Sequence, residues 1–222
     1  MAHASGLRAG VIPVTPFQQN CSLIWCEKTM RGAFVDAGGE PDRLLAAAEK
    51  QGVTIERLLV THGHLDHASA VAELADRLGV PIDGPQQEDA FWIEQIPEHA
   101  SQFGFPPARA FTPDRWLTDG DTVTVGEETF EVVYCPGHTP GHIVFFHRPT
   151  PIAFVGDVLF QGSIGRTDFP RGNFDDLVNS IRMKLFPLGD DVTFVPGHGP
   201  VSTFGRERKS NPYVSDLALG LA

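Results

Sequence analysis

The sequence has few cysteines, few basic residues and no long apolar run, and each scarcity excludes a class of protein. Cys21, Cys26 and Cys135 are odd in number and lie in apolar, strand-like segments, which argues against a secreted disulfide framework and for a reducing compartment. Only 17 basic residues stand against 28 acidic ones, a formal charge of -11, and the basic residues do not cluster. This charge balance excludes a nucleic-acid-binding surface.

Membrane segments are also missing. No run of about eighteen apolar residues occurs, and Met1 to Gly10 contains no apolar stretch of the kind found in signal peptides. We therefore expect a cytoplasmic protein without membrane contact. The 222 residues are 41% hydrophobic and 20% charged, which is ordinary for a packed domain. We expect residues 1–222 to form one domain, with residues 1–10 loosely ordered.

One short polar cluster stands out, with three histidines and a carboxylate in the pattern His62-x-His64-x-Asp66-His67. It follows an apolar, strand-like run and precedes apolar residues at helical spacing, so we place it on a strand-to-helix turn. Neutral imidazoles are common ligands of zinc and iron, and His62 and His64 can face one point while Asp66 and His67 face another. One loop could therefore hold two metal ions. Helix capping would require Asp66 alone and gives no reason for the histidines.

Other polar residues follow predicted strands later in the chain. His138 and His198 each stand among glycines and prolines, which fix a tight turn and would hold an imidazole rigidly. Asp157 follows the apolar segment Ile152–Val155, where a carboxylate is well placed to lie between two cations. His142 begins the next strand after His138, and we expect it to be an outer hydrogen-bond partner of the metal site.

The remaining segments predict short strands alternating with helices. Asp119-Gly120 predicts a hairpin that joins Arg115–Leu117 to Thr122–Val125. The Phe- and Pro-rich segment Gln102–Pro113 predicts a surface loop over the site. Helices are predicted at Gln87–Ile96 and Asn173–Phe186, where apolar residues recur at helical spacing.

Several polar residues are interpreted as structural. Asp36 ends a strand and could be a distant ligand, but Gly38-Gly39 follows it, which favours a turn residue. His3, His99 and His147 lack the context of the other histidines, and we expect them on the surface.

The polar residues named above, in their order along the chain, resemble the full metal signature of the metallo-β-lactamase fold superfamily. The resemblance covers nearly the whole chain and implies an α/β protein, an αβ/βα four-layer sandwich of two mixed β-sheets with flanking helices and the metals at one edge. Within the superfamily, Val14–Phe17 with Asn20-Cys21, and Gly162–Phe169, are similar to the compact glyoxalase II-like hydrolases of the bacterial YcbL type. The segment Gly165–Phe169 is also similar to persulfide dioxygenases.

The resemblance implies roles for these residues. One metal would be held by His62, His64 and His138, the other by Asp66, His67 and His198, with Asp157 bridging them. The mixed nitrogen and oxygen set lacks a thiolate to select zinc, so two divalent transition metals are expected: zinc first, with iron or manganese as alternatives. A metal-bridging hydroxide would then hydrolyse a thioester, S-D-lactoylglutathione, to D-lactate and glutathione, with Asp66 orienting the nucleophile and accepting its proton.

The thiol part of such a substrate carries two carboxylates, which favour Arg and Lys as partners. The candidates are Arg171, Arg206, Arg208 and Lys209, although the last three could equally form a solvated charged tail. Arg166 is expected to support the loop after Asp157 through Asp168. The resemblance to full-length glyoxalase II places much of the glutathione site in a C-terminal helical domain, which we do not expect in this chain, so we expect weak substrate binding.

Two other functions compete with thioester hydrolysis. A mononuclear iron persulfide dioxygenase acting on glutathione persulfide would use His62, His138 and Asp157 as a two-histidine, one-carboxylate triad. A non-catalytic module of the same fold would be expected to have lost ligands, and this chain has lost none. Metal content and oxygen uptake separate the first two functions. The sequence predicts no oligomeric state.

Overall fold

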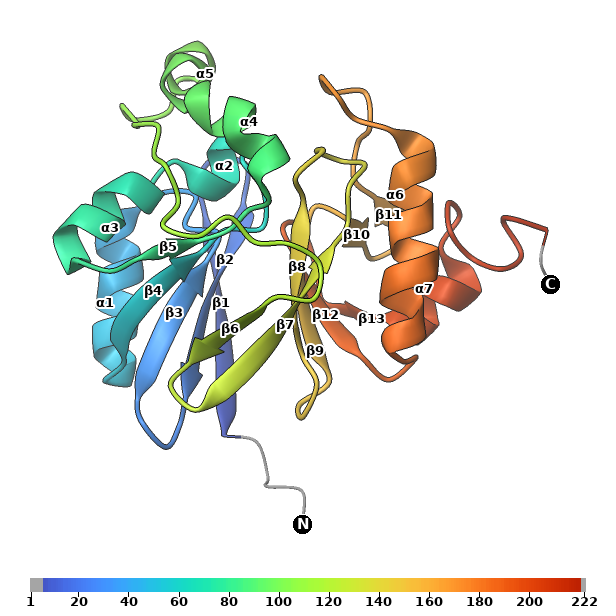
Figure 1. Ribbon diagram of the computed structural model, residues 1–222, viewed down its shortest axis with the longest axis horizontal. Coiled ribbons are helices and arrows are strands. Elements are labelled where there is room, and N and C mark those ends of the chain that lie inside the picture. The colour runs from blue at the N-terminus through green and yellow to red at the C-terminus, as the bar shows by residue number, and fades with distance from the viewer. Residues whose placement is uncertain (1–5, 221–222) are drawn as a thin grey trace.

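The computed structural model describes residues 6–220, and His3 lies outside them. Two β-sheets pack face to face in the middle of the molecule, with helices on both outer faces (Figure 1). The first sheet has the order β1-β2-β3-β4-β5, with β1 Leu7–Val14, β2 Gln19–Cys26, β3 Arg31–Val35, β4 Thr54–Leu59 and β5 Ile82–Asp83.

The second sheet has the order β13-β12-β9-β8-β7-β6, and a small separate ribbon pairs β10 with β11. Its strands are β6 Thr122–Val125, β7 Glu128–Tyr134, β8 Ile143–His147, β9 Ile152–Gly156, β12 Thr193–Pro196 and β13 Ser202–Thr203. The ribbon is formed by β10 Leu159–Phe160 and β11 Ser163–Ile164.

Helices cover each sheet on the side away from the other sheet (Figure 1). Over the first sheet lie α1 Pro41–Gln51, α2 Leu65–Ala68, α3 Val71–Leu78, η1 Gln87–Asp89, α4 Ala90–Glu94 and α5 Ile96–Phe103. Over the second lie α6 Phe174–Ser180, the π-helix η2 Ile181–Leu185, η3 Phe186–Leu188 and α7 Phe204–Ser210. The predicted four-layer αβ/βα sandwich is confirmed.

Three buried clusters hold these layers together. Between the sheets, Val35 and Leu59 pack with Phe130 and Phe145 in one apolar cluster. A second cluster joins the first sheet to its helices and a third joins the second sheet to α6, η2 and α7. The central strands are therefore covered on both faces, which is why Ala33–Val35 of β3 and Ile143–Phe146 of β8 are continuous apolar runs rather than alternating ones.

The direction of the strands brings distant loops to one edge. In the first sheet β4 runs parallel to β3 and β5. In the second, β9 is parallel to β12, and β8 is antiparallel to both β7 and β9, so β7, β9 and β12 point the same way. The loops that follow these strands therefore share one edge of the second sheet.

Two predictions for this scaffold are wrong. Of the segment 1–10 expected to be loose, residues 7–10 are ordered, because β1 begins at Leu7 and pairs with β2 along its whole length, and residues 1–5 lie outside the described residues. The predicted hairpin is also wrong, since β6 pairs with β7 across a turn at Gly126, which has a positive φ of 59°. Arg115 instead bridges to Asp83 of the first sheet. The Asp119-Gly120 turn exists, but it connects that bridge to β6.

The predicted helices and loop are shifted or divided. The helix predicted at 87–96 is divided into η1 and α4, and α5 follows it to Phe103, so the irregular segment begins at Gly104. Of the loop predicted over the site, Gln102 and Phe103 belong to α5 and border the cavity beside the ligands, whereas residues 105–112 line two other cavities. The helix predicted at 173–186 changes to π geometry after Ser180. Within residues 6–220, every helix is too short or too polar to cross a bilayer. Cys21, Cys26 and Cys135 are free and buried, as expected.

Candidate metal centre

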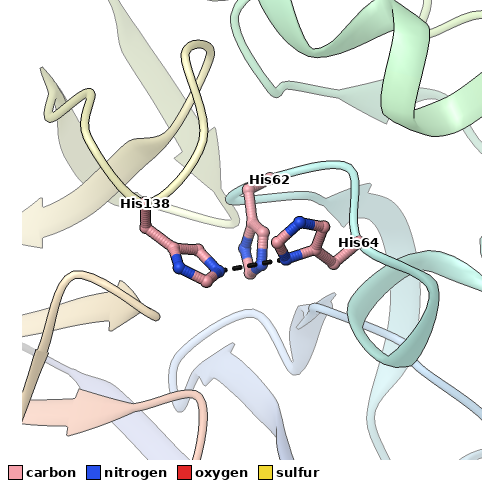
Figure 2. A group of neighbouring side chains, drawn as sticks. All are labelled: His62, His64 and His138. Atoms are coloured by element: carbon pink, nitrogen blue, oxygen red, sulfur yellow. Dashed lines mark hydrogen bonds between the residues drawn. The ribbon is translucent and has the colours of Figure 1, made fainter. Parts of the chain in front are cut away.

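The polar residues predicted from the sequence meet at one edge of the molecule. His62 and His64 lie on the loop between β4 and α2, and His138 lies on the loop between β7 and β8. Figure 2 shows the three imidazoles turned toward a common point from these two loops. Nε2 of His138 is 3.0 Å from Nδ1 of His64. One nitrogen of each ring lies within 4.8 Å of the others, close enough for one cation.

A second group lies beside the first. Asp66 and His67 are on α2 and His198 follows β12, and their ligand atoms also lie within 4.8 Å of one another. Nε2 of His198 is 3.0 Å from Oδ2 of Asp66, and Nε2 of His67 is 3.8 Å from the same oxygen. This set of two imidazoles and one carboxylate can hold a second cation.

Asp157 lies between the two groups. Its Oδ1 is 3.3 Å from Nε2 of His67, and its Oδ2 is 3.6 Å from Nε2 of His138 and 3.7 Å from Nε2 of His198. Gly197 lies against the same carboxylate, because a Cβ at that position would be 2.1 Å from Oδ1 of Asp157. A glycine is therefore required where the chain passes the carboxylate of Asp157.

Asp36 orients two of the histidines from behind. Its Oδ2 accepts a hydrogen bond from Nδ1 of His67 at 2.9 Å and another from the hydroxyl of Thr61 at 2.6 Å. Because that hydroxyl donates to Asp36, its oxygen can accept from Nδ1 of His62, which is 3.0 Å away. Both imidazoles then present an unprotonated Nε2 to the centre.

Backbone carbonyls orient two further histidines. Nδ1 of His138 donates to the carbonyl of Arg166 at 2.7 Å, and Nδ1 of His198 donates to the carbonyl of Phe17 at 3.1 Å. His142 is buried, stacks on His62 with centroids 4.6 Å apart and accepts the backbone N–H of Asp157 at 3.1 Å. It therefore holds the backbone of Asp157 in place.

Burial and neighbouring charges shift the pKa values of these groups in different directions. Burial, followed by repulsion from neighbouring imidazoles, lowers the pKa of His62 well below its usual value, and burial also lowers the pKa of His64 and His138. At His67 burial opposes ionisation, but Asp157 and Asp66 outweigh it and raise the pKa. Burial alone would raise the pKa of Asp157, yet the surrounding imidazoles hold it well below its usual value.

The donor set fits divalent cations. Among residues 6–220, buried Nε2 atoms of His62 and His67 and Oδ1 of Asp157 have no hydrogen-bond partner. Unpartnered buried polar atoms are costly unless a ligand satisfies them. Five imidazoles and two carboxylates suit zinc, iron or manganese, and no thiolate is present to narrow the choice.

Three residues are placed differently from the prediction. Asp36 is not simply a turn residue, because its buried carboxylate holds Thr61 and His67, although its φ of 57° does mark a turn. His147 is not on the surface: it is fully buried, and its Nε2 contacts Glu128 at 2.9 Å. His99 is half-buried against Trp92, with ring centroids 5.8 Å apart. These partners of Asp36 and His147 lie 19 or more residues away along the chain, so no local signal in the sequence marks them.

A cavity of about 430 Å³ opens beside the two ligand groups, and we call it the aromatic pocket. Ring contacts continue from the metal loop into its wall: His64 lies 4.5 Å from Trp92 and 5.0 Å from Phe169, centroid to centroid. Phe17 and Phe103 also line the cavity, at its mouth, and are 48% and 60% exposed, respectively. Its lining is Phe17, His64, Leu65, Asp66, Trp92, Gln95, His99, Gln102, Phe103, Arg166, Phe169 and Pro170.

The cations predicted to bind substrate do not line the aromatic pocket. Arg171 pairs with Glu88, and Arg208 donates to the carbonyl of Phe186 and pairs with Asp190 at 2.9 Å. Arg206 and Lys209 border a different depression on α7. Arg166 does line the pocket, where it forms two hydrogen bonds with Asp168, at 2.9 and 2.8 Å, and lies over Phe169.

Comparison with known families agrees with this geometry. A profile of the metallo-beta-lactamase superfamily matches residues 14–198, which include all seven candidate ligands. The chain belongs to the metallo-beta-lactamase superfamily.

Individual members of the superfamily are similar over nearly their full length. The hydroxyacylglutathione hydrolase GloC of Haemophilus influenzae is 48% identical over 206 residues, which cover 92% of this chain and 97% of that relative. A structure titled BLEG-1 B3 metallo-beta-lactamase has a TM-score of 0.86 and 33% identity, with 93% of this chain and 99% of the other covered. TTHA1623 in a di-iron-bound form has a TM-score of 0.82 and 32% identity, with 92% and 99% covered.

Proposed function

We propose that this protein is a thioester hydrolase of the glyoxalase II type, which cleaves S-D-lactoylglutathione to D-lactate and glutathione. Water supplies the oxygen that bonds to the thioester carbonyl carbon, and the carbon–sulfur bond breaks. The thiolate leaves with the electron pair and takes up a proton, and the acid is released as a carboxylate. The observation that carries this proposal is the complete pair of ligand groups joined by Asp157, in a chain 48% identical to a relative named hydroxyacylglutathione hydrolase.

The two ligand groups would each hold one divalent transition metal. His62, His64 and His138 form the first group and Asp66, His67 and His198 the second, with Asp157 shared. When bound, two such cations lower the pKa of a water to roughly 7 and polarise the substrate carbonyl. Zinc is our first choice, and the di-iron form of a 32% identical structure makes iron the alternative to test.

Asp66 is the residue that we propose accepts the proton of the attacking water. It lines the aromatic pocket, and Oδ2 is 3.0 Å from Nε2 of His198, so one edge of the carboxylate faces the centre. No general acid is needed on the other side, because a thiolate with a parent pKa of about 8.5 leaves without one.

The aromatic pocket is the place we propose for the substrate. Its wall is mainly aromatic, with the amides of Gln95 and Gln102, and the charge of Arg166 is already matched by Asp168. The wall would bind the substrate chiefly through apolar surface and amide hydrogen bonds rather than through free cations.

We expect Phe103→Ala to raise KM for S-D-lactoylglutathione about fivefold and to leave kcat within twofold. Phe103 is 60% exposed at the pocket mouth, beside Phe17 and His99. Covering such a ring on substrate binding contributes about 1 kcal/mol, and the alanine loses it. Steady-state kinetics at several substrate concentrations measure both constants.

Replacing Arg206, Arg208 and Lys209 together by Ala is the matched comparison. These residues lie on α7, outside the pocket, so we expect an unchanged KM and a lower melting temperature from the lost contacts of Arg208 with Phe186 and Asp190. A higher KM in this variant, with the KM of Phe103→Ala unchanged, would show that the cations of α7 bind the thiol part of the substrate.

Thiol release from S-D-lactoylglutathione by the metal-replete protein tests the proposed function. Oxygen uptake with glutathione persulfide is measured in parallel, because the segment Gly165–Phe169 suggests that second reaction and Gly165 lies against the backbone of Asp157. A β-lactam is included because a 33% identical structure is titled a B3 metallo-beta-lactamase. We expect thiol release alone; oxygen uptake with one iron per chain would replace our proposal with the dioxygenase.

A further inference from the structure

A buried carboxylate outside the ligand set connects the two loops that carry the first ligand group. Asp89 is the last residue of η1 and is fully buried. Its Oδ2 accepts the backbone N–H of Gly63 at 2.8 Å and the hydroxyl of Thr139 at 2.8 Å, and its Oδ1 accepts the backbone N–H of Gly141 at 2.5 Å. One side chain therefore ties three points on two loops.

Those three points surround the first ligand group. Gly63 lies between His62 and His64, and Thr139 directly follows His138. The approach is close on both sides, because a Cβ at Gly63 would be 3.0 Å from the carbonyl oxygen of Asp89 and a Cβ at Gly141 would be 2.5 Å from its backbone nitrogen. Neither loop can move relative to η1 without breaking these contacts.

The second ligand group is held by other partners. His67 is bound by Asp36, and His198 by the carbonyl of Phe17. None of the hydrogen bonds of the Asp89 carboxylate within residues 6–220 reaches Asp66, His67 or His198. Different residues therefore hold the two ligand groups in place.

We propose that Asp89 is a positioning residue that sets the metal affinity of the His62, His64 and His138 group selectively. It does so by fixing the distance between the β4–α2 loop and the β7–β8 loop. Outer partners of metal ligands typically change metal affinity by about 10- to 100-fold. This proposal rests on the metal assignment within the proposed function, and not on the substrate.

Asparagine at this position tests the idea because it keeps the shape and removes acceptor capacity. All three partners are donors, and an amide offers one oxygen and an NH₂ group that would face a donor. Burial raises the pKa of Asp89 to about 6, so the wild-type side chain is an anion at the pH of 7.5 chosen for the measurement. Zinc per chain is measured by elemental analysis across a series of buffered free zinc concentrations.

We expect the wild-type protein to bind two zinc ions. In Asp89→Asn, one of the two should dissociate at a free zinc concentration at least tenfold higher than the concentration at which the wild-type protein loses it. Glu207→Gln is the matched control, because Glu207 is also buried and also accepts from three donors: Gly162, Ser202 and Asn211. Its partners lie outside the two loops that carry His62, His64 and His138. We expect this control to keep both zinc affinities even if its melting temperature falls.

Two double variants identify which zinc is lost. Adding His138→Ala to Asp89→Asn should remove no further zinc at intermediate concentrations, whereas adding His198→Ala should remove the remaining one. Equal weakening of both zinc ions by Asp89→Asn, or the same loss in Glu207→Gln, would overturn the proposal. If circular dichroism shows that Asp89→Asn does not fold, Thr139→Val is measured instead, because it removes one of the three donors to Asp89. We expect it to weaken zinc binding by the His62, His64 and His138 group two- to fivefold and to leave the other zinc unchanged. An unchanged affinity at both sites would contradict the positioning role. A protein that holds two zinc ions yet hydrolyses no thioester would refute the proposed function and leave this inference standing.

Discussion

Asp157→Asn is expected to lower kcat/KM for thioester hydrolysis by at least about 100-fold, or roughly 2.7 kcal/mol of transition-state stabilisation. The carboxylate of Asp157 lies between the two ligand groups, with Oδ1 near His67 of the second group and Oδ2 near both His138 of the first and His198 of the second. An amide is neutral, and only one of its two polar atoms can accept, so it can serve one cation but not both. The measurement is steady-state hydrolysis together with metal content per chain.

Arg166→Lys is the comparison for that variant. The Arg166 side chain is 67% exposed and pairs with Asp168, while its backbone carbonyl, which orients His138, is unchanged by the substitution. Lysine keeps the charge and loses the bidentate geometry, so we expect a decrease of only a few-fold. Comparable losses in the two variants, with metal content intact in Asp157→Asn, would show that Asp157 is not the bridge.

Metal removal is expected to have the second large effect: loss of all hydrolysis and a lower melting temperature. The protein purified with excess metal should contain close to two transition-metal ions per chain, one for each ligand group. A ligand present at a thousand times its dissociation constant stabilises the folded state by about 4 kcal/mol. For a domain of this size, each kcal/mol corresponds to roughly 2–4 °C, so a chelator should lower the melting temperature by about 10 °C.

His147→Gln separates this effect from general damage to a buried histidine. His147 is as buried as His62 and has its own carboxylate partner, Glu128, but lies at the far end of β8 from His142. We expect it to retain two metal ions and the chelator-dependent shift in melting temperature. A stable stoichiometry of one iron in the wild-type protein would instead favour the dioxygenase.

Much of the candidate centre could be predicted from the sequence because its ligands carry local signals. His62, His64, Asp66 and His67 fall within one loop, and a helix cap does not need that many imidazoles. His138 and His198 each stand among glycines and prolines, which fix a tight turn and would hold the imidazole rigidly. The fold class followed from the same signature, and the family match confirms it.

The outer partners could not be predicted, since each depends on a contact between distant segments. Asp36 reaches Thr61 and His67 only because β3 lies next to β4, and from the sequence alone it is indistinguishable from a turn residue. Asp89 lies 26 residues from Gly63 and 52 from Gly141, and nothing in its own neighbourhood marks it. The predicted hairpin failed for the same reason, because Arg115 pairs with the first sheet rather than with its neighbour in the chain.

By itself, the sequence determined which atoms are available for the chemistry: five imidazoles and two carboxylates at strand ends, without a thiolate. Only the tertiary structure decided how these atoms are grouped, oriented and exposed. Packing of β4 beside β3, and of η1 against two loops, selects which imidazole nitrogen faces the centre and how far apart the loops stand. It also places aromatic rings rather than the cations of α7 beside the ligands. The physical reason is that ligand identity is a property of single residues, whereas position, burial and hydrogen-bond partners arise from contacts between segments far apart in the chain.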